Sequence, residues 1–328
     1  MNHCYDSPVR GALKRLCTLL GVVLAVMLCA TVYTARLLDQ GNYTRIRDIP
    51  RSAWKMPEPD LRDYIVKLQS KPIGGIGSDL INVLLVGQDH REGEDTARSD
   101  SIILCTYQKE TKTLVMTSFL RDLYVPIPGH GSNRINAAYA SGGLALLEET
   151  LTDNFNLSIR GGIEADFSQF SQIIDLIGGV TLDLRQDEAD FINAETGSTL
   201  TEGTQTLDGQ QALLYSRIRN LDADGDFSRT QRQRKILSSL VAHFQEASLP
   251  ELLQLVENLM PMISTDLSKF QLLTLAMEVL PDLSQIQVLS QTVPAPGTYT
   301  DQTIDGMAVL EADTEAIRDY LTATLVPQ

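Results

Sequence analysis

The stretch INVLLVG at residues 81–87 decides the fold, because it is short, almost wholly apolar and ended by a glycine. A run of this length and composition predicts a buried β-strand. Two further β-rich runs follow at 100–107 and 113–120, and the polar residues KETK at 109–112 separate them. Polar turn residues between two such runs predict a hairpin. The folded part of the chain therefore begins with three strands.

Helical patterns and single strands then alternate along the rest of the chain. The expected helices cover 134–155, 167–177, a stretch capped by Asp208, 226–247, 249–260, 267–280 and 313–324, and the expected strands cover 180–184 and 286–293. Strands interleaved with helices predict an α/β or α+β domain, in which helices flank both faces of a central mixed sheet.

The N-terminal region carries a different signal. Residues 16–35, LCTLLGVVLAVMLCATVYTA, hold no charge, and Arg10, Lys14 and Arg15 precede them. About 20 apolar residues suffice for a helix to cross a bilayer, and the preceding cations keep the short N-terminus inside. We expect a cytoplasmic segment at 1–15, a transmembrane anchor at 16–35, a juxtamembrane stalk at 36–78 and an extracytoplasmic domain at 79–328. A cleaved signal peptide is the alternative.

The cysteines fit an exported domain that folds without disulfide bonds. Of the four cysteines, only Cys105 lies after residue 78, and it falls in the apolar run SIILCTY. One cysteine forms no internal disulfide, so we expect a small core residue here. The sequence shows no Cys/His spacing of the kind that binds a metal.

The charge pattern points to a site for an anion. The net charge of -15 argues against non-specific binding of nucleic acid. From Asp79 onward there are 16 Lys and Arg against 36 Asp and Glu, yet 12 of those 16 cations fall within 89–134 and 217–235. Guanidinium suits a phosphate or pyrophosphate, because its planar fork donates two parallel hydrogen bonds. The alternative is a set of surface salt bridges with the abundant carboxylates.

Two aspartates flank this basic region and suggest a divalent cation. Asp89 follows the first predicted strand and Asp100 opens the second. Mg²⁺ takes one or two protein carboxylates and completes its shell with water and substrate phosphates. Alternatively, Asp89 only ends a strand and Asp100 pairs with Arg98.

Helical spacing predicts which arginines of the second cation-rich stretch, 217–235, lie on the same helix face. Arg229 and Gln233 are four residues apart and share a helix face, whereas Arg232 should point away from that face. Arg217 and Arg219 would point in opposed directions on a regular helix. They can bind one ligand together only if the helix frays there, and the stretch Asn220–Gly225 that follows favours fraying.

A series of motifs resembles the LytR-CpsA-Psr family of bacterial cell-wall proteins. In chain order they are Gly87-x-Asp89, Ala97-Arg98-Ser99-Asp100, Ser118-x-x-Arg121-Asp122, the stretch 134–139, Ile177-Gly178-Gly179-Val180, the stretch 207–213 and Asp226-Phe227-x-Arg229-x-Gln231-Arg232-Gln233. The resemblance is strong over about residues 80–245. One departure is Leu120, where the family usually has proline before the Arg-Asp pair.

The resemblance implies an extracytoplasmic phosphotransferase. Such an enzyme takes a glycopolymer from an undecaprenyl-pyrophosphate carrier and joins it through a phosphodiester bond to muramic acid of peptidoglycan. It also implies a tunnel for the polyprenyl tail. Asp89 and Asp100 match the family's Mg²⁺-associated aspartates. The residues that match its pyrophosphate-binding and catalytic set are Arg98, Arg121, Arg217, Arg219, Arg229 and Gln233.

Several points stay open at the level of the sequence. The polymer could be a teichoic acid, a capsular polysaccharide or another wall polymer. Asp122 is a candidate general base, but an ion pair with a neighbouring arginine is the competing interpretation. The same arginines could also serve a non-catalytic receptor for polyprenyl phosphates. A membrane-tethered regulator fits less well, because about 15 cytoplasmic residues are too few for a DNA-binding module.

Overall fold

A computed structural model describes residues 73–74, 79–89 and 98–327 of the chain. At Asp89 and Arg98 it describes the backbone alone. The predicted cytoplasmic segment, the anchor and almost all of the predicted stalk lie outside the described residues. Within those residues, no helix combines the length and apolarity needed to cross a membrane.

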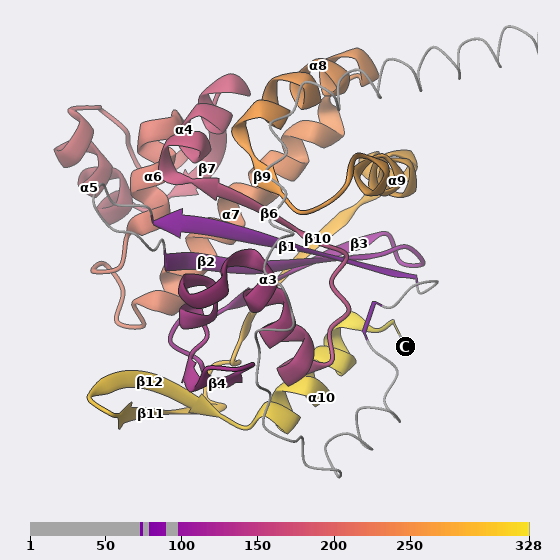
Figure 1. The fold of residues 1–328 in the computed structure, drawn as a ribbon. Coiled ribbons are helices and arrows are strands. Elements are labelled where there is room, and N and C mark those ends of the chain that lie inside the picture. The colour runs from indigo at the N-terminus through magenta and orange to yellow at the C-terminus, as the bar shows by residue number, and fades with distance from the viewer. Residues whose placement is uncertain (1–72, 75–78, 90–97, 328) are drawn as a thin grey trace, which may run out of the picture. The chain divides into compact units, whose positions relative to one another are not determined.

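A mixed six-stranded sheet forms the centre of the domain (Figure 1), in the strand order β10-β3-β2-β1-β6-β9. Its strands are β1 (Leu80–Asp89), β2 (Arg98–Gln108), β3 (Thr113–Phe119), β6 (Gly162–Asp166), β9 (Ser264–Thr265) and β10 (Gln287–Val293). The predicted hairpin is confirmed, because β2 pairs antiparallel with both β1 and β3. Parallel pairs β1–β6 and β3–β10 make the sheet mixed, as predicted.

Two helices cover one face of this sheet, α3 (Asn136–Phe155) and α10 (Thr314–Leu325). The core on this face contains Leu84 and Leu104 of the sheet, Phe155 of α3 and Leu321 of α10, all of which are fully buried. Its aromatic centre is a stack of Phe119 on Phe155, with ring centroids 5.4 Å apart. Burial of this apolar surface supplies the main driving force for folding on this face.

A second core builds up on the other face. It brings together α4 (Phe167–Leu176), α5 (Gln186–Thr196), α6 (Gly209–Arg217), α7 (Asp226–Glu246) and the hairpin of β7 (Val180–Leu184) and β8 (Gly203–Leu207). Tyr215 and Ile236 are among its buried residues. The predicted cap is confirmed, since the Asp208 carboxylate accepts a hydrogen bond from the Gln211 amide at 2.9 Å.

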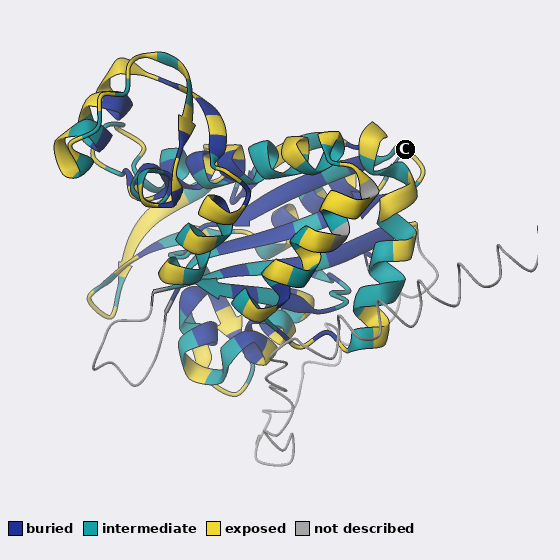
Figure 2. Cartoon of the chain, turned by 90° about the horizontal axis from the view of Figure 1, so that it is seen from above, coloured by how far each residue is buried: buried dark blue, intermediate teal, exposed yellow. Residues whose placement is uncertain are grey.

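The remainder of that face carries α8 (Leu249–Leu259), the short turn η2 (Met260–Met262), α9 (Lys269–Val279) and the turn η3 (Leu280–Gln285). Figure 2 shows these helices in teal and yellow above dark-blue strands. The core beneath them is small: Ile81, Tyr107 and Ile286 are buried, while Leu275 and Val279 of α9 are only partly buried against them.

Several short elements were not predicted. They are β6, β9, α5, β8 and two hairpins, formed by β4 (Tyr124–Ile127) with β5 (Gly131–Arg134) and by β11 (Tyr299–Ile304) with β12 (Met307–Ala312). A break inside α3 was also missed: Gly142 and Gly143 leave the helical conformation, and Gly143 adopts φ 62°, which favours glycine.

Candidate functional site

One end of the central sheet collects most of the predicted site residues. The backbones of Asp89 and Arg98 pair where β1 ends and β2 begins. Asp100 is the third residue of β2, and Arg121 lies two residues after β3 ends. Because β2 and β3 are antiparallel, the start of one and the end of the other meet at the same edge. The fold therefore brings these sequence-distant residues together.

Asp226, the first residue of α7, contacts three of the arginines at this edge. Its Oδ2 atom lies 3.2 Å from Arg121 Nε and 3.1 Å from Arg229 Nη2. Its Oδ1 atom lies 3.6 Å from Arg219 Nε. We call Arg121, Arg219 and Arg229, with Asp100 and Asp226, the arginine cluster.

Asp100 is the second carboxylate of the arginine cluster. Its Oδ1 atom accepts a hydrogen bond from Arg121 Nη1 at 2.8 Å, and its Oδ2 atom lies 3.7 Å from Arg219 Nη2. Burial alone would raise the pKa of Asp100. The hydrogen bond from Arg121 and the charges of Arg121, Arg229 and Arg219 outweigh burial, so its pKa lies below the ordinary value. Asp100 is therefore ionised at neutral pH.

Around Arg229, the positive charges outnumber the negative charges. Its side chain is buried, and its Nε has no hydrogen-bond partner among the described residues. Burial lowers the pKa of Arg229 to about 10; Asp226 opposes this shift, whereas the charges of Arg219 and Arg121 add to it. Asp122 also contacts Arg121, at 3.6 Å, and Arg134, at 3.3 Å, so four guanidiniums here share three carboxylates. This leaves an excess positive charge where an anion could bind.

Gln233 lies beside the arginine cluster, as helical spacing predicted. Its Oε1 atom accepts a hydrogen bond from the hydroxyl of Ser101 at 3.0 Å, and Ser101 follows Asp100 in β2. Arg229 and Gln233 therefore both reach the β2 edge from one face of α7.

Arg217 and Arg219 are separated by the end of a helix. Arg217 is the last residue of α6, and Ile218 leaves the helical conformation with ψ 125°. This frees Arg219 to enter the arginine cluster. Arg217 does not join it by ion pairing: its guanidinium lies over the ring of Phe167, 4.7 Å from the centroid. Phe167 directly follows β6, which ends beside Gln88 of β1, so Arg217 stays at the same end of the sheet.

Arg232 points away from the arginine cluster, as predicted, and is buried in the second core. Its Nε donates to Glu188 Oε1 at 2.8 Å, its Nη1 donates to the Ile218 carbonyl at 3.3 Å, and its Nη2 pairs with Asp222. An alanine variant of Arg232 is therefore no neutral control for the arginine cluster, because it removes a buried cation from Glu188 and Asp222 and leaves them only Arg185.

The departure at Leu120 is accommodated by the local backbone. The Leu120 amide donates to the Val293 carbonyl at 2.8 Å, a bond that proline cannot make, and the side chain is buried. Next in the chain, both oxygens of Asp122 face arginines: Oδ1 lies 3.3 Å from Arg134 and Oδ2 lies 3.6 Å from Arg121. These contacts favour the ion-pair interpretation of Asp122 over a role as general base.

A family model for the LytR_cpsA_psr family matches residues 56–324 of this sequence. The chain belongs to the LytR_cpsA_psr family.

Two relatives in the LytR_cpsA_psr family are named as transferases. The polyisoprenyl-teichoic acid–peptidoglycan teichoic acid transferase TagU of Oceanobacillus iheyensis is 36% identical over 229 residues, which is 66% of this chain and 67% of TagU. The corresponding transferase TagT of Bacillus subtilis is 38% identical over 172 residues, 50% of this chain and 53% of TagT. This chain thus matches about half the length of TagT. A solved structure titled YwtF (TagT) with bound octaprenyl pyrophosphate lipid superimposes with a TM-score of 0.59 and 26% identity, covering 79% of this chain and 95% of that one.

Sequence reasoning missed one member of the arginine cluster. Asp226 stands within a family motif, but we assigned it no role from the sequence. A signal was available, because Asp226 precedes Arg229 by three residues and would lie beside it on a helix. Its contacts with Arg121 and Arg219 could not be found this way, since they depend on the tertiary fold.

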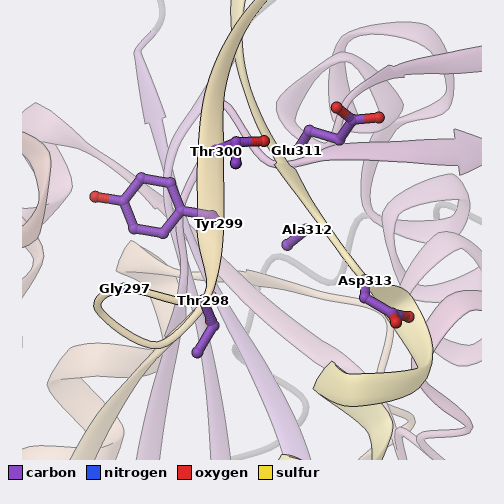
Figure 3. Close-up of a pocket in the computed structure, with 7 residues that line it drawn as sticks. All are labelled: Gly297, Thr298, Tyr299, Thr300, Glu311, Ala312 and Asp313. Carbon is purple, nitrogen blue, oxygen red and sulfur yellow. The ribbon is translucent and has the colours of Figure 1, made fainter.

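A pocket on the β11–β12 hairpin is a separate feature (Figure 3). It has a volume of about 470 Å³ and is lined by Gly297, Thr298, Tyr299, Thr300, Glu311, Ala312 and Asp313. Its charged side chains are carboxylates, so it does not suit a pyrophosphate. The Tyr299 ring projects away from Thr300 and stacks on Phe227 of α7 with centroids 5.4 Å apart, which fastens the hairpin beside the arginine cluster.

Proposed function

We propose that this chain is a membrane-anchored phosphotransferase that moves a glycopolymer from a polyprenyl-pyrophosphate carrier onto peptidoglycan. The observation that carries the proposal is the arginine cluster, which, with its neighbours Arg134 and Asp122, brings four guanidiniums against three carboxylates at one end of the sheet. The names of the relatives TagU and TagT support the substrate class.

In this proposal, Arg121, Arg219 and Arg229 bind the pyrophosphate. Asp100 and Asp226 hold the guanidiniums in place through the contacts described above, so little reorganisation is needed when the ligand binds. Arg217, which carries no carboxylate partner among the described residues, and Gln233 would bind further phosphate oxygens. Arg98 completes the predicted set from the start of β2, where its backbone pairs with Asp89.

The positive charge of the arginine cluster suits a phosphoryl-transfer reaction. A hydroxyl oxygen of peptidoglycan attacks the phosphorus that carries the glycopolymer, the bond from that phosphorus to the bridging oxygen breaks, and the lipid phosphate leaves as an anion. The hydroxyl proton passes to a base. Guanidiniums next to the bridging oxygen stabilise the charge that develops there, which is the main contribution a protein makes to phosphoryl transfer.

We further propose that Asp100 and Asp89 hold a magnesium ion. Asp100 is ionised and lies at the edge where Asp89 ends β1, and one or two carboxylates with substrate phosphates are the ligands that Mg²⁺ prefers. Bound there, the ion would neutralise part of the pyrophosphate charge. We further propose that residues 16–35 anchor the chain in the cell membrane as a single-pass type II protein with residues 79–328 outside.

A transfer assay with the full-length chain tests this function. The chain is incubated with a polyprenyl-pyrophosphate-linked saccharide, peptidoglycan and Mg²⁺, and linked product is measured. Replacing Arg121 or Arg219 by lysine removes a charge-assisted hydrogen bond of about 1.5–3 kcal/mol, so transfer should fall roughly ten- to a hundred-fold. Arg318→Lys is the matched control, because Arg318 lies on α10 and donates to the Asn154 carbonyl. Binding without product would instead indicate a passive receptor.

A further inference from the structure

A β-bulge lies where β1 and β2 reach the arginine cluster. The pairing of the two strands shifts between Gly87 and Gln88 of β1, so Asp100 of β2 has no partner on β1. A bulge leaves its extra residue unpaired and redirects that side chain, and bulges are common beside functional sites. The carboxylate of this extra residue contacts Arg121 and Arg219. The bulge therefore determines where one carboxylate of the arginine cluster lies.

The bulge is supported on the sheet face that α7 covers. A bulge interrupts the ladder of hydrogen bonds between two strands, so the strands around it need other contacts. On this face, Gln233 of α7 accepts a hydrogen bond from the Ser101 hydroxyl at 3.0 Å. Gly87 opposite permits the close packing, because a Cβ atom there would lie 3.1 Å from the Cβ of Ser101.

On the opposite face, which α3 covers, two buried polar side chains meet Gln88. The Tyr139 hydroxyl donates to Glu164 Oε2 at 2.5 Å, and the side chain of Gln88 hydrogen-bonds to both groups. Tyr139 is 8% exposed and Glu164 is 6% exposed. We call Gln88, Tyr139 and Glu164 the Gln88 clamp.

The Gln88 clamp joins three elements at the end of the sheet where the arginine cluster lies. Gln88 is the last residue but one of β1, Glu164 lies on β6, and Tyr139 is the fourth residue of α3. Helix α3 itself begins against the cluster, because the Asn136 amide donates to the Arg121 carbonyl at 3.3 Å. The clamp is therefore placed to hold the strand end opposite the bulge.

Glu164 is held by neutral donors instead of a cation. Burial raises its pKa above the ordinary value, the hydrogen bonds from Tyr139 and Gln88 oppose this, and the charge of Asp266 adds to it; no cation of the described residues is among these influences. Buried polar groups of this kind add little to stability but can specify one geometry. The feature next to the Gln88 clamp that needs a fixed geometry is the bulge.

We propose that Tyr139 and Glu164 are positioning residues, which hold Gln88 and with it the bulge that directs Asp100 to Arg121. Neither residue contacts the ligand; both act through the 2.8 Å hydrogen bond between Arg121 and Asp100. A loosened bulge leaves Arg121 less preorganised, which weakens the binding of an anion. This consequence for pyrophosphate rests on the proposed function, whereas the effect on the bulge does not.

Hydrogen exchange of the full-length chain, followed by mass spectrometry, tests whether the Gln88 clamp holds the bulge. Tyr139→Phe removes one buried hydrogen bond and keeps the ring, so the amides of 98–101 should exchange roughly ten-fold faster. Glu164→Gln keeps an acceptor for the Tyr139 hydroxyl and should have a smaller effect. Tyr107→Phe is the matched control: Tyr107 is also buried, and its hydroxyl donates to Asp282 Oδ2 at 2.8 Å near the other end of β2. Exchange at 98–101 should stay unchanged in this control.

A double-mutant cycle separates positioning from a general loss of stability. The affinity for octaprenyl pyrophosphate is measured without added divalent cation for Tyr139→Phe, Asp100→Asn and the double variant. Tyr139→Phe should weaken binding roughly five-fold in the wild-type background and have no further effect in the Asp100→Asn background, because two residues that act through one interaction are not additive. Tyr107→Phe should lower the melting temperature about as much as Tyr139→Phe does and leave the affinity unchanged.

Three results would overturn the proposal. One is unchanged exchange at 98–101 in Tyr139→Phe, and another is an equal increase there in Tyr107→Phe. The third is an effect of Tyr139→Phe on affinity that is as large in the Asp100→Asn background as in the wild type. A wild-type chain that binds no octaprenyl pyrophosphate would count against the proposed function alone, and the exchange rates at 98–101 would then decide whether the Gln88 clamp holds the bulge.

Discussion

Arg229 and Arg232 lie three residues apart on α7 and are equally buried, at 2% and 3% exposure, but their partners differ. Arg232 pairs with Glu188 and Asp222 and donates to a backbone carbonyl. Arg185 also contacts both carboxylates and pairs with Asp187, so two guanidiniums here face three carboxylates. Arg229 shares Asp226 with Arg121 and Arg219 and keeps an Nε without a hydrogen-bond partner in the described part of the chain.

The difference separates a structural arginine from a ligand-binding one. A buried charge is costly unless it is paired, so a fully paired guanidinium stabilises the fold and has nothing left to donate. Where guanidiniums outnumber carboxylates, as around Arg229, donors remain for an anion. Burial and the like charges of Arg219 and Arg121 lower the pKa of Arg229 to about 10.

The largest effect on stability should come from removing Arg232, the structural arginine. Arg232→Ala removes the 2.8 Å partner of Glu188, which is 2% exposed, and leaves it only a 3.9 Å contact with the cation of Arg185. Removing one partner of a buried ion pair costs about 3–5 kcal/mol, so the free energy of unfolding should fall by that amount. Denaturant unfolding of the purified chain measures it. A loss below about 1 kcal/mol, the value of an exposed pair, would show that these contacts are not structural.

Asp226→Asn tests the arginine cluster and should lower the free energy of unfolding by less than Arg232→Ala does. The three guanidiniums lose a shared negative charge, so the free energy of unfolding should fall by about 1–3 kcal/mol. Removing an internal competitor should also tighten anion binding, so added pyrophosphate should raise the melting temperature more than it does in the wild type. Asp222→Asn serves as the comparison, and its response to pyrophosphate should match the wild type. An unchanged response in Asp226→Asn would contradict the shared-carboxylate account.

Much of the fold could be predicted because its signals are local. The apolar run at 81–87, the turn at 109–112 and the cap at Asp208 each depend on neighbouring residues alone. The spacing of Arg229 and Gln233 likewise predicted that both would reach one side of α7. By contrast, the α3 break at Gly142–Gly143 lies in a strongly helical sequence, which concealed it.

The centre of the site could not be predicted in the same way. Asp226 meets Arg121 across 105 positions of sequence, and Arg232 meets Glu188 across 44. These ion pairs depend on how the helices pack on the sheet, and the spacing of residues along the chain does not predict them. The acidic composition made the partners harder to predict, because each arginine has many carboxylates in the sequence with which it could pair.

Arg217→Ala should affect binding with little effect on stability. Its guanidinium lies over Phe167 at an exposed position, and such a contact contributes about 0.5–1 kcal/mol to stability. If Arg217 binds a phosphate oxygen, its loss should weaken the affinity for octaprenyl pyrophosphate by roughly ten-fold. Calorimetric titration and thermal unfolding of the same samples measure both. An unchanged affinity would remove Arg217 from the proposed pyrophosphate-binding set.

Arg234→Met should have the smallest effect and adds a third case to the comparison. Arg234 is buried, and neither its Nε nor its Nη1 has a hydrogen-bond partner among the described residues. Burial lowers its pKa to about 10, so the charged form is disfavoured. Replacing an unpaired buried charge by a side chain of similar volume should change the free energy of unfolding by less than about 1 kcal/mol. A loss as large as that of Arg232→Ala would reveal a partner of comparable importance.

The central claim is that Arg229 binds the lipid pyrophosphate and Arg232 does not. The most direct test is the affinity of the folded full-length chain for octaprenyl pyrophosphate, measured for Arg229→Lys and Arg232→Lys, which both keep the positive charge. Because an ammonium cannot replace the guanidinium fork, Arg229→Lys should weaken binding roughly ten- to a hundred-fold, whereas Arg232→Lys should leave it unchanged. Equal affinities for the two variants would contradict the claim and show that diffuse positive charge, not the arginine cluster, attracts the ligand.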